Sequence, residues 1–194
     1  MDLAGKVAVI TGGASGMGRA TVRRFVEKGA KCAIFDFNEE KANKVIAEVG
    51  SENAIFCNVD VTKTETVAAG IAATMEAFGA IHVCCNYAGT GNAARTMGKK
   101  GPFPLDSFKR IIDINLIGTF IVLRLVAAEM AKNPGPERGV IVNTASIAAF
   151  DGQKGQAAYA ASKAGIAGMT LPLARDLASQ AVRVCAIAPG IFST

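Results

Sequence analysis

Short apolar runs alternate with helix-like segments along the whole chain, and this alternation limits the folds that it can adopt. A strand, a crossover helix and a further strand in succession imply parallel pairing through right-handed connections. Runs without a polar face are typical of a sheet that helices cover on both sides. The sequence therefore predicts an α/β fold: one Rossmann-like domain over residues 1–194, with a doubly wound parallel sheet in three layers, α/β/α.

The expected elements follow from the apolar runs and from the glycines that end them. Six strands are expected, at residues 7–10, 31–35, 54–59, 81–86, 139–144 and 182–188. Helices are expected at residues 17–28, 39–49, 64–78, 105–132 and 157–178. The segment 88–104 is rich in Gly, Lys and Pro and is expected to be a loop.

Charge and composition exclude some partners and favour others. The net charge is +5, but the basic residues are scattered, with only the short pairs Arg23-Arg24 and Lys99-Lys100. Nucleic-acid binding requires clustered basic residues and is not expected. Charged residues make up 19% of the chain, below the ~25% of typical soluble domains. We therefore expect surface to be hidden between subunits as well as in the core.

The cysteines, the single histidine and the apolar stretch 111–130 suggest neither a metal site nor a membrane span. The five cysteines include no C-x-x-C and lie in or beside strand-like runs, which predicts buried, reduced thiols in a reducing compartment. A single His82 and no zinc-like spacing predict no metal. No signal peptide precedes the first strand, and Asp113 and Arg124 interrupt the apolar stretch 111–130, so no membrane span is expected. The expected location is cytoplasmic, or the mitochondrial matrix in a eukaryote.

A glycine-rich turn joins the first expected strand to the first helix. Gly12, Gly16 and Gly18 have the spacing G-x-x-x-G-x-G rather than the more familiar G-x-G-x-x-G. Glycines allow a tight turn and a close approach of the backbone to a pyrophosphate, and the helix that follows presents free N–H groups to the anion. A plain tight turn is the alternative, but the position after the first strand predicts a dinucleotide site.

Asp36 ends the second expected strand, where an acidic residue meets the adenosine ribose in dinucleotide-binding folds. A carboxylate there accepts hydrogen bonds from the ribose diol and repels a 2′-phosphate. The glycine turn contains no Arg or Lys that could hold such a phosphate. The sequence therefore predicts NAD, rather than NADP, as the cofactor.

Three residues suggest an alcohol-oxidising centre. Tyr159 and Lys163 are four residues apart in one helix and share a face. Ser146 follows the expected strand 139–144, at the carboxyl edge where open α/β sheets bind ligands. A tyrosine with a pKa of about 10 is a poor base at pH 7, but a nearby ammonium favours the phenolate and lowers that pKa. Ser146 would hold the substrate oxygen in line.

These motifs resemble the short-chain dehydrogenase/reductase family, and they occur in family order over almost the whole chain. The matching pieces are Thr11–Gly18, Asn86-Tyr87-Ala88-Gly89, Asn115, Ser146, Tyr159–Lys163 and Pro189-Gly190. Asn-Tyr-Ala-Gly departs from the usual Asn-Asn-Ala-Gly. The resemblance implies that Ser146, Tyr159 and Lys163 are catalytic, and that Asn115 completes a tetrad by bending its helix and holding a water near Lys163.

The resemblance also implies a set of cofactor contacts. Asp60 and Val61 would flank the adenine, and Tyr87 would lie on the adenosine side of the bridge. Ser15 and Met17 would line the pyrophosphate and the nicotinamide. Tyr159 and Lys163 would touch the nicotinamide ribose, and Phe192 and Thr194 would contact the nicotinamide end.

Within the family, stretches such as residues 139–146 and 169–177 and the Lys99-Lys100 loop are similar to NAD-linked tetramers that act on 3-hydroxyacyl-CoA. This likeness implies oxidation of a 3-hydroxyacyl-CoA to the 3-ketoacyl-CoA in fatty acid metabolism, by a homotetramer.

Two alternatives remain open: a dehydrogenase for another secondary alcohol, such as a steroid or a small hydroxy compound, and a non-catalytic scaffold. Family members continue beyond the sixth strand with a substrate lid and a seventh strand, so we expect the 194 residues to lack both.

Overall fold

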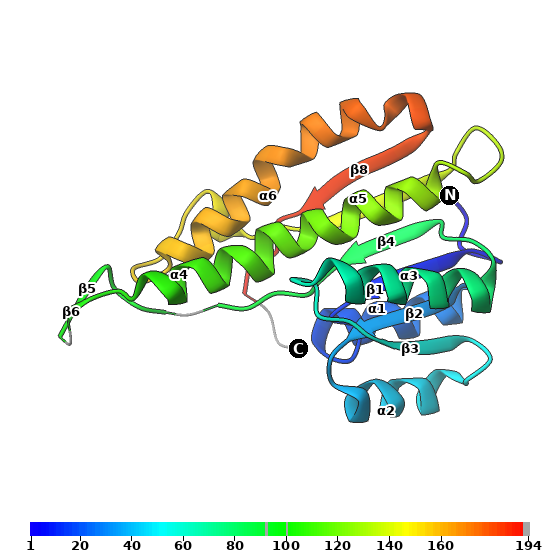
Figure 1. Cartoon of the computed structure of the whole chain (residues 1–194), viewed down its shortest axis with the longest axis horizontal. Helices are drawn as coiled ribbons and strands as arrows, with labels where there is room; N and C mark the ends of the chain where they lie inside the picture. The colour runs from blue at the N-terminus through cyan, green and yellow to red at the C-terminus, as the bar shows by residue number, and fades with distance from the viewer. Residues whose placement is uncertain (92, 100, 192–194) are drawn as a thin grey trace.

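Six parallel strands form one sheet in the order β3-β2-β1-β4-β7-β8 (Figure 1). The computed structural model describes residues 1–91, 93–99 and 101–191. The strands of the sheet are β1 (Val7–Thr11), β2 (Lys31–Asp36), β3 (Ala54–Asn58), β4 (Val83–Asn86), β7 (Gly139–Thr144) and β8 (Val182–Ile187). The six expected strands are confirmed, with ends that shift by one or two residues.

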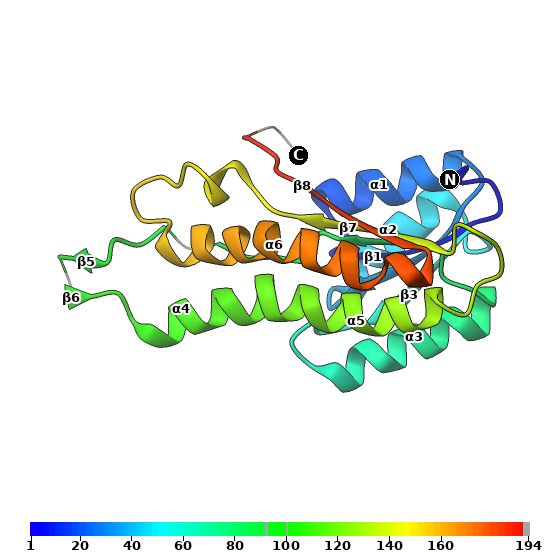
Figure 2. The same ribbon diagram turned by 90° about the horizontal axis from the view of Figure 1, so that it is seen from above.

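Helices cover both faces of this sheet, which confirms the three-layer architecture (Figure 2). One face carries α1 (Gly16–Glu27) and α2 (Glu39–Val49), and the other carries α3 (Thr64–Phe78), α5 (Gly118–Met130) and α6 (Ala157–Asp176). Alternate residues of a strand point to opposite faces. Ala8 and Ile10 of β1 therefore pack in the core below α1 and α2, whereas Val9 packs in the core below α3 and α5.

The strand order reverses at β1. The chain winds outward from β1 through β2 to β3, then returns to the other side of β1 and continues through β4, β7 and β8. A crevice opens beyond the carboxyl ends of the strands at such a reversal, and ligands bind there in open α/β sheets. Thr11 and Asn86, the last residues of β1 and β4, are paired neighbours at this point.

The long helix expected over 105–132 is continuous but not uniform. It consists of α4 (Leu105–Ile112), a π-helical turn η1 (Asp113–Ile117) and α5. Single π-turns inside α-helices are frequent at functional sites, and the buried residue of this one is Asn115. The expected loop 88–104 contains a small hairpin, β5 (Met97–Gly98) and β6 (Gly101–Pro102), which the sequence pattern did not indicate. Short 3₁₀ turns, η2 (Ile147–Ala149) and η3 (Ala178–Gln180), flank α6.

The charged residues do not make the stretch 111–130 too polar to span a bilayer, contrary to expectation. By length and composition, the continuous helix Leu105–Met130 could cross a bilayer. Its packing explains the apolar composition, because α5 lies against α3, β4 and β7 and buries Val122, Val126 and Met130. The core of the sheet, rather than lipid, covers this face of the helix.

The cysteines are all free, but one of them is not buried. Cys32, Cys57, Cys84 and Cys85 lie in the core, as expected, whereas Cys185 is exposed. The expectation of five buried thiols fails at Cys185 because α6 covers only one face of the edge strand β8, and Cys185 points from the other face. His82 is structural: its Nδ1 accepts a hydrogen bond from the Val7 N–H at 3.2 Å.

Candidate active site

The glycine turn between β1 and α1 is shaped for close backbone approach. Gly12 has a φ of +65°, which favours glycine, and its N–H donates to the Phe35 carbonyl at 2.8 Å. A Cβ on Gly18 would lie 2.2 Å from the Gly12 carbonyl oxygen, so no larger residue fits there. Ser15 does not cap α1 with its side chain, and the first turn of the helix has no acidic residue. The helix start is therefore suited to an anion.

A cleft of about 480 Å³ opens at the reversal point, next to this turn. It is lined by nine of the predicted cofactor residues: Gly12, Ser15, Gly16, Met17, Gly18, Asp36, Asp60, Val61 and Tyr87. Tyr159 and Lys163 lie outside its lining, and Phe192 and Thr194 lie outside the described residues. The structure thus gathers residues from four strand ends into one elongated site, and their types fit a dinucleotide.

Asp36 is held at the rim of the cleft by two backbone groups. Its Oδ2 accepts from the Ala14 N–H at 3.1 Å, and its Oδ1 accepts from the Asn38 N–H at 3.0 Å. Each carboxylate oxygen keeps a further lone pair for a ribose hydroxyl. The cation that follows the glycine turn, Arg19, is paired with Glu48 on α2. That pairing draws the guanidinium away from a 2′-phosphate, which is consistent with NAD.

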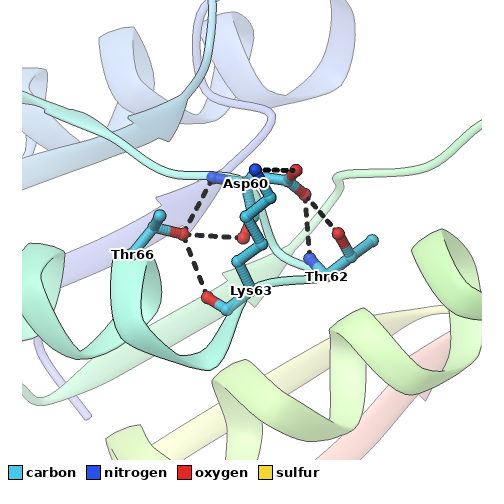
Figure 3. A network of polar contacts seen from close by, with 4 residues as sticks. All are labelled: Asp60, Thr62, Lys63 and Thr66. Atoms are coloured by element: carbon cyan, nitrogen blue, oxygen red, sulfur yellow. Dashed lines mark hydrogen bonds and ion pairs between the residues drawn. The ribbon is translucent and has the colours of Figure 1, made fainter.

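Asp60 sits in a network of hydroxyl and backbone groups at the other end of the cleft (Figure 3). Its Oδ1 accepts from the Thr62 hydroxyl at 2.7 Å and from the Thr62 N–H at 3.0 Å. The Thr66 hydroxyl donates to the Asp60 carbonyl at 2.8 Å and accepts from the Asp60 N–H at 3.1 Å. Hydrogen bonding from the Thr62 hydroxyl lowers the pKa of Asp60. The site therefore presents a fixed carboxylate that can accept a hydrogen bond from an amino group.

Lys163 is buried at the carboxyl end of β7. Its Nζ donates to the Thr144 carbonyl at 2.6 Å and lies 5.7 Å from the centre of the Tyr159 ring. Burial lowers the pKa of Lys163 to about 8. Ser146 follows Thr144 by two residues, and its Oγ accepts from the Ala148 N–H at 3.1 Å. The helix α6 and the end of β7 thus bring the serine, the tyrosine and the lysine to one edge of the sheet.

Asn115 joins the cofactor cleft to the helix that carries Tyr159. Its Oδ1 accepts from the Thr90 N–H at 2.8 Å, and its Nδ2 donates to the Thr90 carbonyl at 2.9 Å and the Ser162 Oγ at 3.0 Å. The Ser162 hydroxyl in turn donates to the Tyr159 carbonyl at 2.7 Å. A π-turn lies where the resemblance implied a bend, and the side-chain amide holds the loop after β4 to α6.

The sequence motifs did not identify all residues of the site. Ala88 and Gly89 of the Asn86–Gly89 motif also line the cleft, and the lining residues outside the motifs are Phe35, Phe37, Val59, Thr90, Arg110 and Ile114. Arg110 and Ile114 are one helical turn apart, and Ile114 precedes Asn115, so helical spacing offered a signal for both. Phe37, Val59 and Thr90 each adjoin a predicted contact or motif. Among the described residues, no group of His, Cys, Asp or Glu is arranged to hold a metal ion.

Known sequences place this site in a family. Residues 6–194 match the family described as short chain dehydrogenase. The 3-hydroxyacyl-CoA dehydrogenase type-2 of Homo sapiens is 50% identical over 195 residues, which cover 98% of this chain and 74% of that protein. The protein of the same name from Drosophila melanogaster is 48% identical over 193 residues, covering 97% of this chain and 75% of that protein.

Solved structures agree with this placement. A crystal structure of 3-hydroxyacyl-CoA dehydrogenase type-2 from Mycobacterium avium superposes with a TM-score of 0.91 at 40% identity, covering 98% of this chain and 76% of that one. An NAD⁺-bound xylitol dehydrogenase superposes with a TM-score of 0.90 at 36% identity, covering 98% of this chain and 72% of that one. The match over residues 6–194, together with this degree of identity, establishes that the chain belongs to the short-chain dehydrogenase family of NAD-dependent oxidoreductases.

Proposed function

We propose that this enzyme oxidises 3-hydroxyacyl-CoA thioesters to 3-ketoacyl-CoA. The observation that carries the proposal is a serine, tyrosine and lysine group beside a dinucleotide cleft, in a chain about half identical to relatives named for that substrate. The fit of the cofactor rests on the glycine turn that excludes a Cβ, the uncapped start of α1 and the carboxylate of Asp36. The glycine turn, the start of α1 and Asp36 would hold NAD, which would supply the acceptor for the hydride of the alcohol carbon.

The remaining chemistry is assigned to side chains of this protein. Tyr159 in its phenolate form takes the proton of the substrate hydroxyl, so that the carbon–oxygen bond can become a carbonyl. The Lys163 Nζ lies 5.7 Å from the centre of the Tyr159 ring, so its positive charge is on hand for the negative charge that develops during proton transfer. Ser146 donates a hydrogen bond to the substrate oxygen and holds it next to Tyr159. Asn115 positions α6 through Ser162, whose hydroxyl donates to the Tyr159 carbonyl.

Tyr159→Phe removes the proton-accepting oxygen but keeps the ring. General acid–base groups typically contribute ~10²–10⁴-fold to rate, so we expect kcat to fall by about that factor while the Kd for NADH stays nearly unchanged. Steady-state kinetics and NADH titration measure the two quantities. Tyr87→Phe, which removes the only other phenolic hydroxyl of the chain, should lower kcat far less. A Tyr159→Phe enzyme with near-normal kcat would refute the assignment.

Burial of Lys163 makes the stability of the nucleotide-free protein depend on pH. Its pKa is about 8 in the folded protein against 10.5 in the unfolded reference, so the unfolded chain binds more protons between these values. Stability therefore rises with pH across this window. Between about pH 7.5 and 10.5, we expect the free energy of unfolding of the wild type to rise by about 3 kcal/mol relative to that of Lys163→Met.

Urea unfolding of both proteins at each pH measures this gain. Burial also raises the pKa values of Cys32 and Cys85. These thiols lower the stability of the folded protein as the pH rises above the ordinary pKa of a cysteine. That contribution is present in both proteins and cancels in the difference. A difference that does not change with pH would mean that the Lys163 side chain keeps an ordinary pKa.

Asp36 accounts for the preference for NAD. We expect a higher kcat/KM with NAD than with NADP, because the carboxylate binds the ribose diol and repels a 2′-phosphate. Asp36→Ala should reduce the ratio of kcat/KM with NAD to kcat/KM with NADP, mainly by lowering kcat/KM with NAD. Asp36→Asn removes the charge but keeps an oxygen that can accept from the Ala14 or Asn38 N–H. It should therefore raise kcat/KM with NADP more than Asp36→Ala does. Equal or better use of NADP by the wild type would contradict this role.

The hairpin of β5 and β6 provides basic groups for the phosphates of coenzyme A. Lys99 is exposed at its tip, and Lys100 lies outside the described residues. We expect the double change Lys99→Ala with Lys100→Ala to raise KM for 3-hydroxybutyryl-CoA at low salt. It should leave KM for the corresponding acyl-pantetheine, which lacks the nucleotide phosphates, unchanged.

The matched control is the double change Lys28→Ala with Lys44→Ala, which removes two exposed charges, one at the C-cap of α1 and one in α2. Turnover of a steroid or a small secondary alcohol, but not of the acyl-CoA, would identify a different substrate class. Binding of NADH without turnover of any substrate would favour a scaffold role.

We also propose a homotetramer in a reducing compartment. Support comes from exposed apolar side chains on neighbouring helical segments, Ile117, Phe120 and Leu171, and from the low content of charged residues. Exposed large apolar side chains on adjacent segments are found at subunit interfaces. Sedimentation equilibrium gives the subunit number, and a monomer would contradict the proposal. The free thiols agree with the compartment.

A further inference from the structure

Arg110 lies in the cofactor cleft although no sequence motif includes it. It belongs to α4 and precedes Ile114 by one helical turn, and both residues line the cleft together with Asp60 and Val61. A second hollow of about 620 Å³ adjoins the same end and is also lined by Asp60, Arg110 and Ile114. Arg110 therefore stands where the cleft meets this outer hollow, whose lining does not include the glycine turn.

The cleft that Arg110 lines has several apolar walls. Phe35, Phe37, Val59 and Val61 line the same cleft. Phe37 is 80% exposed, and so its ring is also free to contact a ligand. A flat aromatic base can fill a slot with these walls and present its amino group to the fixed carboxylate of Asp60. The adenine of the cofactor has this chemistry.

The guanidinium of Arg110 is not used by the protein. In the part of the chain that the structure describes, it makes no ion pair with an acidic side chain and no side-chain hydrogen bond. By contrast, the nearby cation Lys63 lies 4.0 Å from the Asp60 carboxylate. A planar, weakly hydrated guanidinium stacks flat on a π face, whereas an ammonium meets that face as a strongly hydrated point charge.

We infer that Arg110 covers the adenine base of the bound dinucleotide, with its guanidinium stacked on the outer face of the purine. The inference rests on the proposed dinucleotide-dependent function and adds a residue that determines cofactor affinity. The role needs the plane of the side chain as well as its charge. Lys109 provides a matched control, because it precedes Arg110 and lines the outer hollow without lining the cleft.

The test measures the binding of two halves of the cofactor to the whole protein. Isothermal titration with ADP-ribose should give a Kd about fivefold higher for Arg110→Ala than for the wild type. The binding free energy of a cation–π contact at an exposed site corresponds to about that ratio of Kd values. The Kd for nicotinamide mononucleotide, measured by competition with NADH, should not change. In turnover, KM for NAD should rise by the same factor as the ADP-ribose Kd, with kcat unchanged.

Two further variants separate stacking from charge. Arg110→Lys keeps the charge but loses the plane, and it should bind ADP-ribose as weakly as Arg110→Ala does. Lys109→Ala should bind ADP-ribose like the wild type. Restored affinity in Arg110→Lys, or an equal loss in Lys109→Ala, would show a general charge effect and overturn the inference.

The remaining outcomes are also decisive. Unchanged ADP-ribose affinity in Arg110→Ala, or a parallel loss for nicotinamide mononucleotide, would overturn the role of Arg110 while the dinucleotide site stands. If the wild type binds ADP-ribose but does not oxidise the acyl-CoA, the proposed substrate fails and the Arg110 result is unaffected. If the wild type does not bind ADP-ribose, both proposals fail together.

Discussion

The reversal of strand order at β1 is the constraint on which the rest of the structure depends. Because β2 and β4 lie on opposite sides of β1, the loops that follow these strands diverge and leave a crevice between them. The glycine turn, Asp36 and the loop after β4 meet at that crevice for this reason alone. Each is a short distance from a strand end, and a buried parallel sheet fixes those ends firmly. The cofactor site is thus a consequence of topology, and its specificity comes from a few side chains.

A buried amide connects this site to the reacting centre. Asn115 is fully buried, and its side chain satisfies both backbone groups of Thr90 and the hydroxyl of Ser162. Buried polar groups of this kind are costly when unpaired, so the three partners hold one another in a single arrangement. The loop that lines the cofactor cleft and the helix that carries Tyr159 and Lys163 are therefore positioned together. The π-turn is the local departure from regular helix at which Asn115 makes these contacts.

Features that repeat with a regular period could be predicted from the sequence. Alternating strands and helices gave the fold, and Gly12, Gly18, Asp36 and Asp60 lie at strand or helix ends that their positions indicate. The failures concern tertiary packing. Cys185 is exposed because only one face of β8 is covered, and the composition of the helix 105–130 reflects a core contact that its sequence does not reveal. Arg110 was missed because a charged residue on an exposed helix usually indicates only a solvated face. The π-turn depends on contacts of Asn115 with distant residues.

The central claim is that the assembled site transfers hydride directly from an alcohol carbon to NAD. The most direct measurement uses 3-hydroxybutyryl-CoA that carries deuterium on the hydroxyl-bearing carbon, followed by mass analysis of the NADH that forms. The account predicts that the deuterium is recovered in the NADH and that none is lost to water, because Tyr159 handles only the hydroxyl proton. Unlabelled NADH with deuterium released to the solvent, or no NADH at all, would contradict the account.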